Sequence, residues 1–131
     1  MAKGPRRNLL TPGAAHDFGR GLQFVRRAQQ RTLADAGRDG GISAQYLQNI
    51  ESGRKVNLTD DAFNHLIAAY RVPAEVIENQ WLKARILTAL DERGLDDKQR
   101  DIVWRAVESR LDELGYHMRD QLARTVQELL G

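Results

Sequence analysis

Residues 41–55 have the sequence GISAQYLQNIESGRK, which predicts a short helix with a signal at each end. Ser43 can cap the start, because its side-chain oxygen can accept a hydrogen bond from a backbone N–H of the first turn. Gly53 can end the helix in a left-handed backbone conformation. Leu47 and Ile50 are three residues apart, so they fall on one face. We expect that face to be buried.

The other faces of this helix carry small or amide side chains, namely Ala44, Gln45, Gln48 and Asn49. An amide can form two hydrogen bonds at once with the edge of an adenine in the DNA major groove, and an alanine can contact a thymine methyl group. Arg54 and Lys55 follow directly, where DNA phosphates would lie if the helix occupied a groove. The pattern therefore predicts a helix that reads DNA bases. The alternative is an ordinary amphipathic helix of a protein core.

This stretch resembles the recognition helix of the lambda-repressor/Cro-like helix-turn-helix proteins, also called the XRE family. The residue types that match the family in order are Gly41, Ile42, Ser43, Leu47, Ile50, Glu51 and Gly53. Thr32 stands where the family caps its second helix, Leu58 and Thr59 where a further helix starts, and Val72 and Pro73 where that helix closes. The resemblance covers residues 17–78. It implies that DNA phosphates are contacted by Thr32, Ser43, Arg54, Lys55 and Asn57.

The chain departs from the family pattern just before Ser43. Three glycines fall within five residues, at Gly37, Gly40 and Gly41, and glycines oppose helix formation. Leu33 stands where the family has a glutamine. We therefore predict a short second helix over residues 32–37 and a loose turn before the DNA-reading helix.

Apolar residues at helical spacing predict helices on both sides of this motif. Before it, a helix is expected to follow Pro12 or Gly13 and to run to about Gln30, with Arg26 and Arg31 mostly off its apolar stripe. After it, helices are expected over residues 59–70, 73–93, 96–114 and 116–130. No strand pattern appears. The predicted fold class is all-α, a five-helix lambda-repressor-like helix-turn-helix module followed by a C-terminal helical dimerisation region.

Three parts are expected along the chain. Residues 1–13 would form a flexible basic arm, residues 14–78 the helix-turn-helix DNA-binding domain, and residues 79–131 a C-terminal helical oligomerisation region. Lys3, Arg6 and Arg7 of the arm could enter the minor groove of DNA. The arm could equally be a disordered tail that attracts DNA only weakly.

Broad apolar stripes on the last three predicted helices favour a homodimer, because a second copy would bury them. The residues expected at this interface are Trp81, Leu87, Val103, Val107, Leu111, Leu122 and Val126. Ile102 and Ala106 belong to the same stripe on the 96–114 helix. The alternative is that these helices fold back on the N-terminal module of a monomer.

Composition supports a globular protein that binds DNA at one end. Of the 131 residues, 41% are hydrophobic and 29% charged, and no apolar run approaches the ~20 residues that span a bilayer. Residues 1–55 carry ten Lys and Arg against four Asp and Glu, whereas residues 56–131 carry ten against fourteen. A basic half that holds the DNA-reading helix fits contact with double-stranded DNA. We expect a cytoplasmic, nucleoid-associated protein.

No constellation for catalysis or metal binding is visible in the sequence. Cysteine is absent, and His16, His65 and His117 are far apart without a ligand pattern. We expect no enzyme activity, cofactor or metal. The favoured function is a sequence-specific DNA-binding transcriptional regulator, a repressor, acting as a homodimer. The alternative is an antitoxin-like or adaptor protein whose C-terminal helices bind a partner protein while the helix-turn-helix targets DNA.

Overall fold

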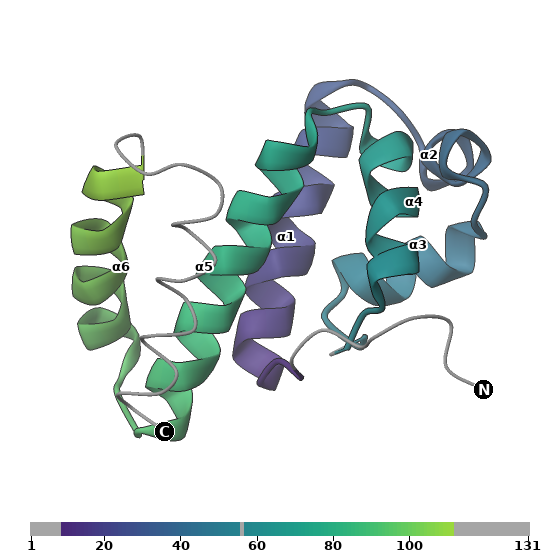
Figure 1. Cartoon of the computed structure of the whole chain (residues 1–131). Coiled ribbons are helices and arrows are strands. Elements are labelled where there is room, and N and C mark those ends of the chain that lie inside the picture. Colours follow the sequence, from purple (N-terminus) through teal and green to yellow (C-terminus); the bar gives the residue numbers. More distant parts are fainter. Residues whose placement is uncertain (1–8, 56, 112–131) are drawn as a thin grey trace.

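The computed structural model describes residues 9–55 and 57–111, which form six helices and no strand. This confirms the predicted all-α class. The helices are α1 (Pro12–Ala28), α2 (Leu33–Gly40), α3 (Ala44–Glu51), α4 (Asp60–Tyr70), α5 (Ala74–Glu92) and α6 (Asp97–Leu111). Helix α5 lies between α1 and α6, and α2, α3 and α4 gather on the far side of α1 (Figure 1). The predicted arm residues Lys3, Arg6 and Arg7, together with Leu122 and Val126, lie outside the described residues.

Side-chain caps set the starts of the first four helices. Thr11, Thr32, Ser43 and Thr59 each accept a hydrogen bond from the backbone N–H three residues further on. Such caps satisfy backbone donors that have no partner inside the helix. The predicted caps of α2, α3 and α4 are thereby confirmed. Helix α6 begins with a reciprocal pair, in which Asp96 and Gln99 each accept from the other's backbone N–H.

One aromatic cluster occupies the centre of the helix-turn-helix module. Phe18 of α1 and Phe63 of α4 meet Trp81 of α5 edge to face, with ring centroids 5.2 and 5.7 Å apart. Trp81 is only 2% exposed, and Leu87 belongs to the same core at 8%. Both were predicted at a dimer interface. That prediction is wrong for these two residues, because neighbouring helices of the same chain already bury them.

Helix α6 packs back on α5 around a second apolar cluster. Its members are Leu82, Ile86, Leu90 and Trp104, with Val103 and Val107 half-buried against them. Ile102 is 62% exposed and Ala106 is also exposed. Part of the predicted apolar stripe of α6 therefore does not pack against α5. Leu111 ends α6, and its side chain lies outside the described set. Within the described residues, no helix is both long and apolar enough to cross a membrane.

The turn before α3 is tight, contrary to prediction. Helix α2 continues through the glycines to Gly40, and only Gly41 adopts a positive φ, of 68°. Ile42 N–H then donates to the Gly37 carbonyl at 2.9 Å. The glycines are needed because a Cβ on Gly37 would lie 2.6 Å from the Ile42 oxygen, and one on Gly40 would lie 2.7 Å from the Ala69 Cβ.

Candidate nucleic-acid interface

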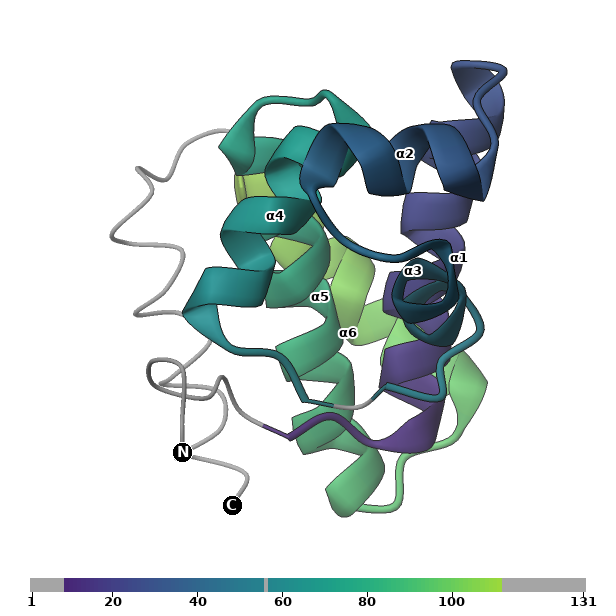
Figure 2. The same ribbon diagram turned by 90° about the vertical axis from the view of Figure 1, so that its right-hand side faces the viewer.

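The predicted base-reading residues lie on the outward face of α3. Gln45 and Gln48 are exposed, and Ala44 and Asn49 are half-buried. The opposite face buries Leu47 and Ile50 completely or nearly so. In Figure 2 the view runs nearly along α3, with α2 crossing above it. The amide-bearing face of α3 is therefore the part of the helix that a groove could receive.

The amides of this face already interact with one another. Gln45 Nε2 donates to Asn49 Oδ1 at 3.2 Å, across one turn of the helix. This contact holds both side chains in place, yet it leaves the Gln45 oxygen and the Asn49 nitrogen for other partners. The pair presents a donor and an acceptor close together, which is the combination that an adenine edge requires.

The predicted phosphate-contacting residues lie at helix starts and in the loop after α3. Thr32 and Ser43 are exposed at the N-termini of α2 and α3. Such ends attract anions through free N–H groups and the helix dipole. Arg54 is exposed, whereas Asn57 is half-buried. Lys55 Nζ lies 5.8 Å from the centre of the Tyr46 ring, and this cation–π contact steadies the lysine next to α3.

A buried ion pair fixes the C-terminal end of α3. Arg26 of α1 donates from Nε and Nη2 to the two oxygens of Glu51, both at 2.8 Å, and from Nη1 to the Arg31 carbonyl at 2.9 Å. Tyr70 of α4 donates its hydroxyl to Glu51 at 2.8 Å. Arg26 and Glu51 are 8% and 5% exposed. Arg26, which was expected mostly off the apolar stripe of its helix, is therefore buried.

Arg26 and Tyr70 both keep their protons at ordinary pH, because the pKa of each is raised. The hydrogen bond to Glu51 raises the pKa of Arg26 despite its burial. Burial, together with the charge of Glu51, raises the pKa of Tyr70 far above its usual range, so the hydroxyl remains a donor. Three helices are thus tied together by charge-assisted hydrogen bonds, the stronger class of such bonds.

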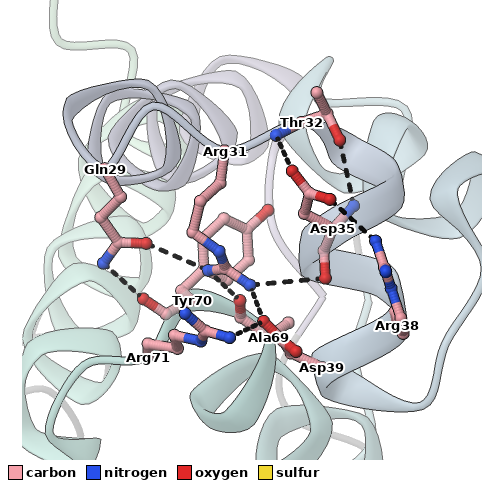
Figure 3. Close-up of polar contacts among 9 residues, drawn as sticks. All are labelled: Gln29, Arg31, Thr32, Asp35, Arg38, Asp39, Ala69, Tyr70 and Arg71. Atoms are coloured by element: carbon pink, nitrogen blue, oxygen red, sulfur yellow. Dashed lines mark hydrogen bonds and ion pairs between the residues drawn. The ribbon is translucent and has the colours of Figure 1, made fainter.

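A second arginine cluster joins α2 to the end of α4 (Figure 3). Arg31 donates to the Ala69 carbonyl at 2.7 Å and to Gln29 Oε1 at 3.1 Å, and it forms an ion pair with Asp39. Arg71 reaches the same Asp39 carboxylate at 2.8 Å. Only 10% of the Arg31 side chain is exposed, although Arg31 was expected mostly off the apolar stripe.

His65, for which the sequence showed no metal-ligand pattern, has a structural role. Its Nδ1 lies 2.7 Å from the Gly40 carbonyl oxygen, a distance at which an Nδ1–H satisfies the end of α2. The approach depends on the missing side chain of Gly40, which sequence spacing does not reveal. Across residues 9–55 and 57–111, no group of three potential ligands could hold a metal ion.

Comparison with known families agrees with this geometry. Residues 17–80 match a family model described as a helix-turn-helix domain. No curated protein and no solved structure matches the chain significantly. The matched residues include all of α2, α3 and α4 together with Phe18 and Phe63 of the aromatic cluster, and Trp81 follows directly after the match. Residues 17–80 are therefore similar to a helix-turn-helix domain, and this similarity supports a helix-turn-helix DNA-binding protein.

Proposed function

We propose that this protein is a sequence-specific transcriptional repressor of the lambda-repressor-like (XRE) kind, which acts in the cytoplasm on nucleoid DNA. Helix α3 would lie in the major groove of the operator. The observation that carries the proposal is the outward amide face of α3, backed by the buried Arg26–Glu51–Tyr70 network. A rigid support matters because base readout requires side chains held in a defined register.

We propose further that two copies bind together. A single module makes few base contacts, and two linked modules gain affinity through effective concentration. Val103 and Val107 on α6 remain the described residues that support such an interface, since both are only half-buried against α5. Selection of bound DNA from a random pool would test this, because a symmetric dimer requires half-sites ~34–36 Å apart or a multiple of it. Selected sites without symmetry, together with a monomer in light scattering, would refute the dimer.

A second candidate function is an adaptor that brings a partner protein to DNA. The observation in its favour is Ile102, 62% exposed on a helix outside the matched domain. This candidate predicts that Ile102→Glu leaves operator binding intact. The dimer model instead predicts that Ile102→Glu weakens operator binding if Ile102 lies at the interface between copies.

Gln45→Ala and Asn49→Ala are each expected to weaken operator binding by about 1–3 kcal/mol, the value of a good bidentate contact. Non-specific DNA should be bound as before. Fluorescence anisotropy with the selected operator and a scrambled duplex measures both quantities. Asn64→Ala on α4 is the control, since it removes an exposed amide from a helix other than α3. Unchanged selectivity in either α3 variant would exclude that residue from base readout.

Arg54→Ala is expected to weaken binding to every sequence alike, because a phosphate contact carries no base information. The slope of log affinity against log salt concentration should fall by about one unit. Arg93→Ala, at the exposed end of α5, is the control for lost positive charge and should leave the slope unchanged. A shift in sequence preference with an unaltered slope would contradict the phosphate role.

A further inference from the structure

A cleft of about 630 Å³ lies where α1 and α6 flank α5. Its volume falls within the range of about 300–1,000 Å³ that is common for small-molecule sites. The described residues that line it come from α1, α5 and α6, so the DNA-reading helix does not contribute. Because α6 lies beyond residues 17–80, the cleft joins the helix-turn-helix domain to the segment that follows it.

The charges of this cleft are balanced. Three cations, Arg20, Lys83 and Arg100, and three carboxylates, Asp17, Asp97 and Asp101, line it. A polyanion such as a nucleotide would meet the carboxylates, and a polyamine would meet the cations. A small ligand that carries one charge of each sign would find a partner for both.

Two buried polar atoms at this cleft lack a hydrogen-bond partner among the described residues. They are Asp17 Oδ2 and Arg100 Nε. Asp17 uses its other oxygen to pair with Lys83 Nζ at 3.3 Å. Buried polar atoms are normally satisfied, so an unmatched carboxylate oxygen marks a place where a donor would be stabilised. Oδ2 itself is buried, but the Asp17 side chain lines the cleft and keeps 34% of its surface exposed, so the carboxylate is accessible there.

The floor of the cleft is apolar. Leu87 of α5 and Trp104 of α6 line it, and they are 8% and 9% exposed. Lys83 Nζ lies 5.7 Å from the centre of the Trp104 ring, so this cation already contacts the aromatic side chain of the floor. Arg20 is exposed on the α1 wall and is free to move toward a carboxylate.

We propose that this cleft binds a small zwitterion with an apolar side group, the chemistry of a free apolar amino acid. The ammonium group would lie at Asp17, the carboxylate at Arg20, and the apolar group over Trp104 and Leu87. A ligand in this position touches both the helix-turn-helix domain and α6. The proposal concerns a site separate from α3 and does not depend on the operator.

The two tryptophans allow a direct test on the full-length chain. In ¹⁵N-labelled protein each indole N–H gives one NMR signal, and Trp104→Phe identifies the signal of the cleft. We expect L-leucine or L-phenylalanine to shift the Trp104 signal saturably while the signal of buried Trp81 stays in place. Isopentylamine and 4-methylpentanoate each lack one charge of leucine and should bind at least about tenfold more weakly.

Arg20→Met and Asp17→Asn should each weaken leucine binding by about tenfold or more, the effect of losing one charged partner. Arg27→Met, exposed on α1 outside the cleft, is the matched control and should bind as the wild type does. Thermal unfolding of each variant shows whether the chain is folded. The proposal is overturned by the absence of a saturable Trp104 shift at about 10 mM of either amino acid. Equal binding of 4-methylpentanoate, or unchanged binding by both cleft variants, would overturn it as well. No DNA is present, so either result leaves the repressor proposal to its own experiments.

Discussion

Glu51→Ala is expected to lower the free energy of unfolding by about 3–5 kcal/mol, the usual cost of removing one partner of a buried ion pair. The substitution leaves Arg26 Nε, Arg26 Nη2 and the Tyr70 hydroxyl without their acceptor. The guanidinium cannot lose its proton, so it stays charged in the interior. Since whole domains are stable by only about 5–15 kcal/mol, we expect the substitution to remove a large fraction of the free energy of unfolding. Urea unfolding followed by circular dichroism measures the loss.

The double variant Arg26→Met/Glu51→Leu separates two quantities: the cost of an unpaired buried charge, and the contribution of the ion pair to folding stability. Exchanging both partners of a buried pair for apolar residues is often close to neutral, so the double variant should be more stable than Glu51→Ala. Arg54→Ala, three residues away on the surface, should change stability by no more than about 0.5 kcal/mol. If Glu51→Ala fell within that same limit, the network would not be what holds α3 against α1 and α4.

Local signals in the sequence predicted the helix-turn-helix well, because each depends on neighbours along the chain. Ser43 and Thr59 cap α3 and α4 through N–H groups only three residues away. Gly53 has the positive φ, 81°, that its place after α3 predicted. Leu47 and Ile50 lie on the buried face that their spacing requires. These features need no knowledge of the rest of the fold.

Side chains whose partners are distant in sequence were misplaced. Arg26 was placed mostly off the apolar stripe although it lies four residues after buried Leu22, because charged residues are rarely buried without a partner. Only the fold brings Glu51, 25 residues later, to within hydrogen-bonding distance. Trp81 was assigned to a dimer interface for the same reason. Its partners Phe18 and Phe63 lie on other helices, and the sequence of its own helix does not indicate them.

Glycine residues have two different structural roles in this chain, ending a helix or allowing close packing, and their spacing in the sequence does not distinguish the two. Gly41 ends α2 in the left-handed region, as turn chemistry suggests. Gly37 and Gly40 lie inside α2, where they allow other backbone atoms to approach closely. The low helix preference of glycine predicted a break at these positions. In the structure, packing against α4 and against the turn before α3 compensates for that low preference. Gly19 in the middle of α1 is the most extreme case of this second kind.

Gly19→Ala is expected to cost about 3 kcal/mol or more of folding stability, at or beyond the upper end of overpacking effects. A Cβ on Gly19 would lie 2.2 Å from the Ile50 carbonyl oxygen and 2.5 Å from that of Glu51. Both are backbone atoms of α3, so no flexible side chain can move aside. The last turn of α3 must shift away from α1, and the Arg26–Glu51 bonds must lengthen with it. Operator affinity should therefore fall even under conditions where the variant remains folded.

Gly13→Ala is the matched control on the same helix. Its Cβ would have no neighbour closer than 3.5 Å, an ordinary contact, and alanine is favoured over glycine in a helix by about 1 kcal/mol. We therefore expect Gly13→Ala to be neutral or stabilising in the same urea titration in which Gly19→Ala is strongly destabilised. The two substitutions add the same methyl group to the same helix, so their difference isolates the contact between α1 and α3. If Gly19→Ala matched Gly13→Ala in both stability and operator binding, the close approach of these two helices would be refuted.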